Sequence, residues 1–91
     1  MLSNTTNMPS DAEALALAAL AATLTDERRA QRFLDLTGLD ADELRARVGD
    51  RAVLAAALGF LEAHEPDLIE VAQAIGIKPE RLIAARSELE R

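Results

Sequence analysis

The sequence contains no cysteine, no tryptophan and no tyrosine, and it has only two phenylalanines among 91 residues. The absence of cysteine excludes a disulfide scaffold, a thiolate metal site and a thiol nucleophile. Basic residues are outnumbered, because ten lysines and arginines stand against sixteen acidic residues and leave a net charge of −6. This balance disfavours binding to nucleic acid or to an anionic membrane through bulk charge.

No targeting or membrane-spanning segment is recognisable in the sequence. The apolar run at residues 14–22 is too short to cross a bilayer as a helix, which takes about 20 residues. Asp11 and Glu13 stand where a signal peptide needs basic residues. We therefore expect a cytoplasmic protein that does not enter a membrane. Residues 1–9 are polar and aperiodic, which predicts a disordered leader in which either methionine could be the start site.

The residues that are abundant are aliphatic, with 19 alanines and 15 leucines in helical periods. Since no stretch alternates with period two, we expect no strands and one all-α domain over residues 10–91. Start and stop signals divide this domain into six short helices. The first expected helix runs from 11 to about 24 after the Ser10/Glu13 capping box, and the second runs over 26–37 between an N-cap at Thr25 and a stop at Gly38. The third runs from 41 to about 48 between the Asp40/Glu43 capping box and Gly49, and the fourth runs from 51 to about 63 after Asp50. The fifth has Pro66 in its first turn and a stop at Gly76, and the sixth runs from Pro79 to about 89.

The order of the helices suggests an internal duplication of a three-helix unit. Residues 12–48 can be set against residues 50–86 at an offset of 38, so that Gly38 meets Gly76 and Leu44 meets Leu82. The alternative is that any two helical segments rich in leucine and alanine look alike. Two copies are too few for an open solenoid, so a duplication predicts a closed pair of units with pseudo-twofold packing.

The first and fourth expected helices are apolar on all sides, which predicts that they are buried all round and pack together at the centre. Alanines and Gly59 would allow their close approach. The amphipathic second and fifth helices would cover this pair, through residues such as Phe33 and Val71. If one side of the central pair stays uncovered, we expect it to form a dimer interface, because a large exposed apolar patch is unusual on a monomer.

His64 is the only histidine, and it lies among Glu62, Glu65 and Asp67. One interpretation is a metal or acid–base cluster. The interpretation that we favour is a histidine whose cationic form complements the C-terminal end of a helix dipole, because one imidazole with no second histidine or cysteine is a weak metal signal. No serine lies near a candidate base, and the scattered glycines form no phosphate loop. We expect no catalytic residue, no metal, no cofactor and no small-molecule substrate.

Residues 71–82 resemble a helix-turn-helix, with the small Ala72 where two helices would cross and Gly76 in the turn. The helix that follows would present Lys78, Arg81 and Arg86 to phosphates or guanine edges. Residues 78–91 hold four basic and three acidic residues, so the helix is barely basic. A plain corner between two helices is the simpler interpretation, and binding to nucleic acid is the alternative.

A second group of basic residues lies on the second expected helix. Acidic residues lie among these basic residues, which is typical of a solvent-exposed helix face with local salt bridges. The basic residues are Arg28, Arg29 and Arg32, and the acidic ones are Asp26, Glu27 and Asp35.

The segment from Arg32 to Leu39, followed by Asp42–Arg45, has the pattern R-F-L-x-x-T-G-L-x-x-x-x-L-R. In this pattern the chain resembles the uncharacterised bacterial domain-of-unknown-function family 3572. The resemblance extends over about residues 12–86. It implies a bacterial, cytoplasmic, all-helical protein with no assigned activity, and it transfers no catalytic residue to this chain.

Together these observations favour a small non-catalytic helical protein. We expect it to bind an unknown protein partner, or a second copy of itself, near the exposed side of the first and fourth helices. The alternative is a DNA-binding regulator that uses the helix after Gly76.

Overall fold

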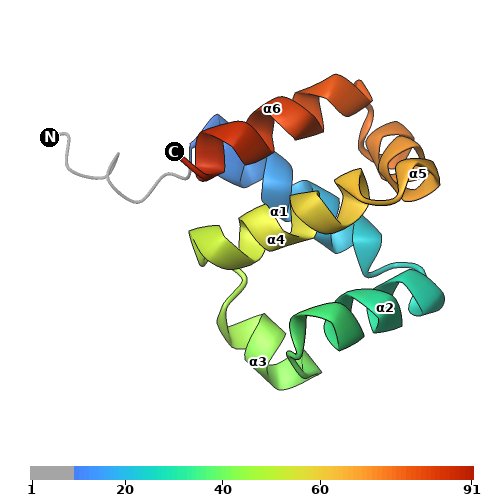
Figure 1. Cartoon of the computed structure of the whole chain (residues 1–91), viewed down its shortest axis with the longest axis vertical. Coiled ribbons are helices and arrows are strands. Elements are labelled where there is room, and N and C mark those ends of the chain that lie inside the picture. The colour runs from blue at the N-terminus through green and yellow to red at the C-terminus, as the bar shows by residue number, and fades with distance from the viewer. Residues whose placement is uncertain (1–9) are drawn as a thin grey trace, which may run out of the picture.

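The described part of the chain, residues 10–91 of the computed structural model, consists of six helices and their connections (Figure 1). No strand occurs among these residues, so the all-α prediction is confirmed. The predicted leader at residues 1–9 lies outside the described residues. The helices are α1 (Asp11–Thr23), α2 (Glu27–Thr37), α3 (Ala41–Ala46), α4 (Arg51–Glu62), α5 (Glu65–Ile75) and α6 (Pro79–Leu89).

Most helix ends follow the predicted capping chemistry. Ser10 and Glu13 form a complete capping box at α1, and Asp40 and Glu43 form another at α3, so each pair satisfies two backbone N–H groups that the helix leaves unpaired. Asp50 caps α4 through the N–H of Ala52. Two glycines in the left-handed conformation end helices: Gly38 (φ 75°) follows α2, and Gly76 (φ 76°) follows α5.

Two predicted boundaries are wrong. Asp26, and not Thr25, caps α2, because its carboxylate accepts a backbone N–H of the first turn at 3.0 Å. The Thr25 hydroxyl instead donates to the carbonyl of Ala22 at 2.7 Å, so Thr25 belongs to the end of α1. Helix α3 is also shorter than expected, since Arg47 is its C-cap residue and Gly49 lies beyond it.

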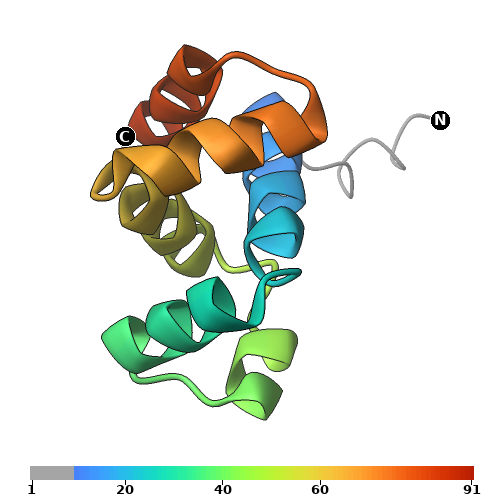
Figure 2. The ribbon, with the colours of Figure 1, turned by 90° about the vertical axis from the view of Figure 1, so that its right-hand side faces the viewer.

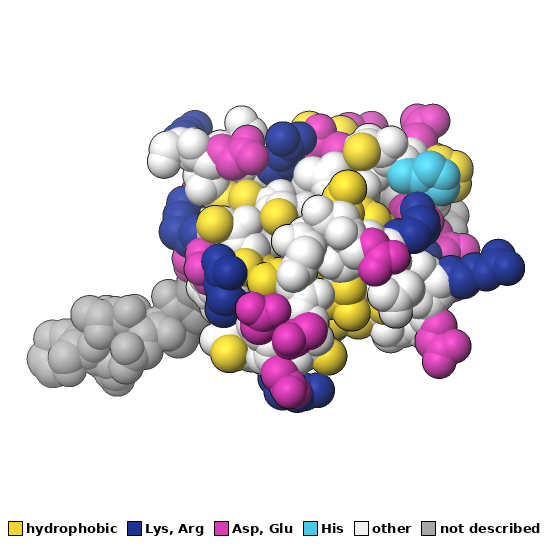
Figure 3. Space-filling view, turned by 60° about the horizontal axis from the view of Figure 1, so that its bottom comes forward, with side chains coloured by type: hydrophobic (Ala, Val, Ile, Leu, Met, Phe, Trp, Pro, Cys, Tyr) yellow, Lys and Arg dark blue, Asp and Glu magenta, His cyan; other side chains and the backbone are white. Residues whose placement is uncertain are grey.

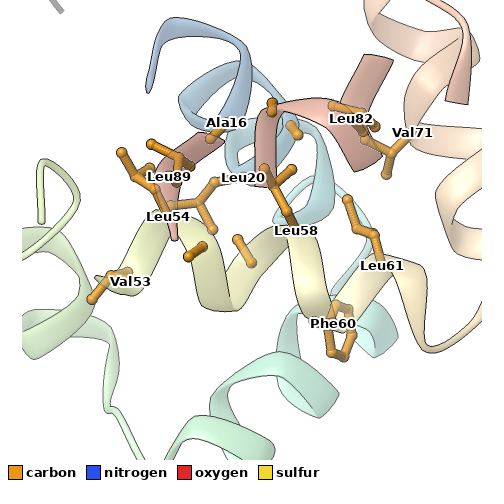
Figure 4. Packing of buried hydrophobic residues seen from close by; sticks show 14 of the residues in the cluster. Ala16, Leu20, Val53, Leu54, Leu58, Phe60, Leu61, Val71, Leu82 and Leu89 are labelled. Carbon is orange, nitrogen blue, oxygen red and sulfur yellow. The ribbon is translucent and has the colours of Figure 1, made fainter. Parts of the chain in front are cut away.

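The core forms where α1, α4, α5 and α6 meet. Helices α1 and α4 pack against each other, as predicted, and α5 and α6 both pack on this pair. Figure 2 shows α5 and α6 at one end of the molecule, next to α1 and α4. Figure 4 shows how leucines from separate helices meet there, with Leu20 of α1, Leu58 of α4 and Leu82 of α6 pointing into one cluster. Each of these three side chains is almost completely buried.

Helices α2 and α3 lie at the other end of the molecule (Figures 1 and 2). We call residues 27–46 the α2–α3 lobe. The lobe joins the core mainly through Phe33, which is fully buried and meets Phe60 of α4 edge to face, with ring centroids 5.4 Å apart. Leu44 is the buried residue that α3 contributes. The lobe is therefore joined to the core by few fully buried hydrophobic side chains, with Leu34 and Leu39 partly buried against it.

The packing does not confirm the predicted duplication. Helix α6 packs closely against both α1 and α4, but α3, its counterpart in the first half, makes no comparable contact with either helix. The two halves thus use their third helices differently. The local similarity around Gly38 and Gly76 reflects a shared way of ending a helix with a left-handed residue.

The expected role of Gly59 is also wrong. Gly59 does not make room for α1, because a Cβ at this position would meet the guanidinium of Arg86 on α6, 3.5 Å from its Cζ. The guanidinium lies there because it bridges two carboxylates, those of Glu62 and Glu90, at 3.1 and 3.2 Å. Gly59 therefore lies under an ion-paired arginine at the edge of the α4–α6 contact.

Candidate functional site

Helix α1 is not buried all round, contrary to the prediction. Its inner side is buried in the core through Ala12, Ala16, Ala19, Leu20 and Thr23. Its opposite side is exposed to solvent, with Leu17 at 43% and Leu24 at 37% of their full exposure. We call this side the outer face of α1. It consists of Ala14, Leu17, Ala18, Ala21 and Leu24.

The outer face of α1 carries no charged side chain, because the sequence from Ala14 to Thr25 contains none. The nearest acid on the helix, Glu13, pairs with Arg51 of α4 at 3.3 Å. Isolated exposed hydrophobic residues are normal on any protein surface, but a row of them along one helix is not. Leu17 and Leu24 are two turns apart on the same side, with exposed alanines between them, so they form such a row.

Helix α4 is buried on most sides but, contrary to the prediction, not all round, because its exposed strip borders a hollow of about 400 Å³. The strip includes Ala52 and Ala56, and the α2–α3 lobe forms the opposite wall with Leu36 and Leu39. Leu36 is the most exposed large apolar residue of the described chain, at 72%. The hollow is shallow and open, so it is a less defined surface than the straight outer face of α1.

An ion cluster fixes the α2–α3 lobe to α5. We call the set Arg29, Arg32, Asp67 and Glu70 the ionic clasp. The Asp67 carboxylate accepts a hydrogen bond from Arg32 at 2.7 Å and lies 3.7 Å from the guanidinium of Arg29, and Arg29 also donates to Glu70. The Arg32 guanidinium lies over the ring of Phe60 at 5.4 Å from its centroid. Charge pairing and aromatic packing thus act at the same junction.

Arg29 is the most deeply buried charge in the described chain, with 6% of its surface exposed. Besides the acids of α5, it donates to the backbone carbonyls of Ala22 and Thr23 at 3.4 Å. These carbonyls lie at the C-terminal end of α1, where the helix leaves acceptors unpaired and favours a positive charge. Arg29 therefore connects α1, α2 and α5.

The expectation of a solvated, locally bridged basic face on α2 is accordingly wrong for Arg29 and Arg32. Their partners are Asp67 and Glu70, 35 to 41 residues away in the sequence, and not the acids on α2. The signal that could have indicated this was the spacing of Arg29 and Phe33, four residues apart on one helical face. A long-range pair still needs the three-dimensional arrangement to be identified.

His64 precedes the first turn of α5, and its Nδ1 lies 3.0 Å from the Asp67 carboxylate. The structure therefore brings together His64 and Asp67 from the predicted group, with Glu62 turned to Arg86 on the other side. Burial raises the pKa of Asp67, but the hydrogen bond and charge of Arg32, aided by His64, outweigh it and hold this pKa below its ordinary value. Asp67 thus acts as a structural anion.

Within residues 10–91, no group of three or more histidine or acidic side chains is arranged to hold a metal ion. Every buried side-chain nitrogen or oxygen in this range also has a hydrogen-bond partner. No buried polar group among the described residues is therefore left to point toward a ligand.

The structure separates the three residues of the DNA-binding alternative. Lys78 and Arg81 line one hollow at the corner between α5 and α6. Arg86 lies on another side of α6, where Glu62 and Glu90 bind its guanidinium. Figure 3 shows acidic and basic side chains mixed around apolar patches on one face of the molecule.

Comparison with known proteins identifies the family. The chain matches the family described as "Protein of unknown function (DUF3572)" over residues 9–91 and belongs to it. Comparison with curated proteins found no match, and comparison with solved structures found none either. Among the described residues, no helix has both the length and the apolar character that crossing a membrane requires.

Proposed function

We propose that this chain acts as a small, non-catalytic interaction module that binds another protein chain through the outer face of α1. One observation carries the proposal: α1 is apolar on both sides, and only one side is covered by the core. Exposing leucines to water is unfavourable by roughly 25 cal/mol for each Å² of apolar surface. A helix that keeps Leu17 and Leu24 on such a side gains stability when a partner covers them. A cytoplasmic location is part of the same proposal.

The polar groups of the chain support a non-catalytic role. The groups with the strongest claim to acid–base chemistry are His64 and Asp67, which face each other, and Asp67 also faces the two arginines of the ionic clasp. Catalytic acids and bases need a cleft that holds a reacting group and a pKa matched to proton transfer. Asp67 has the opposite property, since its pKa is held low by its arginine partner.

The DNA-binding alternative has weaker support. Two carboxylates already neutralise Arg86, which leaves Lys78 and Arg81 near the start of α6. Two cations on a chain of net charge −6 supply little of the phosphate binding on which protein–DNA affinity depends. No feature of the described surface favours this alternative over the outer face of α1.

A photo-crosslinking side chain placed at position 18, inside the outer face, tests the proposal in cells. We expect crosslinked protein adducts at position 18 and none at position 83, where Ile83 of α6 is as exposed as Leu17, at 43%. Leu17→Glu should abolish the adducts at position 18, whereas the matched Ile83→Glu should preserve them. Equal labelling at both positions, or no adduct at position 18, would overturn the proposal.

A further inference from the structure

We infer that the partner on the outer face of α1 is the same face of a second copy of this chain, with the two α1 helices antiparallel. The inference rests on the proposed function, because it names the partner for the same surface. Four residues of this face, Ala14, Leu17, Ala21 and Leu24, alternate between alanine and leucine with spacings of three, four and three residues. Such a 3–4 spacing lets one straight helix pack along another over several turns.

The order of large and small residues selects the antiparallel arrangement. In a twofold dimer with antiparallel helices, residues whose numbers sum to 38 lie opposite each other. Leu17 then faces Ala21 of the second copy, and Ala14 faces Leu24 of the second copy. Every leucine meets an alanine, so large side chains fill the space that small ones leave. The twofold axis makes each contact occur twice, as a self-complementary interface requires.

The parallel arrangement lacks this fit. It would place Leu17 against Leu17 and Ala21 against Ala21 in the two copies, so that bulky layers alternate with empty ones. Voids next to crowded contacts are unfavourable in protein packing. The face therefore matches itself in the antiparallel direction only.

Charge supports a second copy at this surface. Each copy has a net charge of −6, so two copies repel each other over most of their surfaces. The outer face of α1 avoids this repulsion because it is uncharged from Ala14 to Leu24. The antiparallel arrangement also sets the dipoles of the two α1 helices in opposite directions.

The size of the face sets the strength of the dimer. Ten residues separate Ala14 from Leu24, which corresponds to about 15 Å of helix. The area that two helices bury along such a short contact is well below the roughly 800 Å² per partner of a standard stable interface. We therefore expect a weak, concentration-dependent dimer and not an obligate one.

Single cysteines provide the test, since the chain contains no other thiol. Ala18 lies next to the proposed axis, and the two copies of this residue are only about 3 Å apart along the helices. We expect Ala18→Cys to form a disulfide-linked dimer under mild oxidation at about 0.1–1 mM protein, a range suited to weak association. Ala14→Cys alone should remain unlinked, because its two copies are about 15 Å apart along the helices. A mixture of Ala14→Cys and Leu24→Cys should form the mixed dimer.

The controls separate this inference from the proposed function. Ile83→Cys, at a residue as exposed as Leu17, should give no dimer. Leu17→Glu added to Ala18→Cys should remove the dimer. Crosslinking of Ala14→Cys alone would overturn the antiparallel arrangement. A wild-type chain that sediments as a monomer up to about 1 mM, with no linked Ala18→Cys dimer, would overturn the second copy as the partner. The photo-crosslinking result at position 18 would then decide the proposed function independently.

Discussion

Replacing Asp67 with asparagine removes one charge from the ionic clasp and keeps the size of the side chain. Asp67 is 8% exposed and accepts from Arg32 at 2.7 Å, with Arg29 at 3.7 Å. An asparagine can keep one hydrogen bond to Arg32, but it cannot balance the charge of Arg29, whose side chain is almost fully buried. We therefore expect Asp67→Asn to lower the free energy of unfolding.

The size of the effect follows from what the arginines retain. Removing one partner of a fully buried ion pair costs roughly 3–5 kcal/mol. Arg29 still has Glu70 and two backbone carbonyls, and half of the Arg32 side chain reaches water, so the loss should be smaller. We expect about 2–3 kcal/mol for Asp67→Asn. For a domain of this size, this lowers Tm by roughly 10–20 °C.

Urea unfolding followed by circular dichroism at the helix band measures this loss, because the chain has no tryptophan or tyrosine for fluorescence. Glu70→Gln is the matched control on the same helix, since Glu70 also pairs with Arg29 but is 67% exposed. An exposed pair is worth less than about 1 kcal/mol. If both variants lose the same small amount, the clasp does not hold the lobe and the reasoning is refuted.

The same pair predicts how stability depends on pH. The pKa of Asp67 is lowered in the folded chain from its ordinary value of 3.8. The contribution of Asp67 is therefore complete above this ordinary value and is lost as the pH falls through the lower folded pKa. The stability difference between wild type and Asp67→Asn should shrink in the same acid range. A difference that stays constant below pH 4 would contradict this assignment.

Four further outcomes follow from the packing and the charges. Gly59→Ala should stabilise the chain by about 0.5–1 kcal/mol in the urea assay, because α4 gains a better helix former and the new Cβ meets Arg86 only at ordinary contact distance. Gly38→Ala should destabilise it by about 1 kcal/mol, because alanine is strained at a φ of 75°. Phe33→Ala should cost about 3–5 kcal/mol, since Phe33 is fully buried against Phe60. In fluorescence anisotropy at about 50 mM salt, we expect no duplex DNA binding, whereas binding that Arg81→Ala weakens would favour the DNA-binding alternative.

Local chemistry made the helices predictable. The capping boxes at Ser10 and Asp40, and the glycines that end α2 and α5, act within four residues of the chain, so the sequence alone indicates them. The misplaced N-cap at Thr25 shows the limit of this reasoning. Threonine and aspartate are both good N-caps, and the backbone conformation, which is extended at Asp26, decides between them.

The candidate surface was predictable only in part. The apolar character of α1 on both sides is visible in the sequence, but which side the core covers depends on where α5 and α6 pack. The spacing of Arg29 and Phe33 indicates an inward-facing arginine, but its partners in the ionic clasp could not be predicted, because Arg29 has acids nearby in the sequence yet binds Asp67 and Glu70 from a distant helix. Gly59 was misassigned for the same reason, since its neighbour is an arginine side chain of the last helix.

The closure of the core by α6 has a consequence for how the chain emerges during synthesis. Helix α1 is complete at Thr23, but the last helix that covers its inner side ends at Leu89. At about 5–20 residues per second, the ribosome adds that stretch in roughly 3–13 s. Until α6 is complete, the part of the inner side of α1 that α6 covers stays open to water beside the apolar outer face, and a nascent chain in that condition offers chaperones, or a neighbouring nascent copy, an early place to attach.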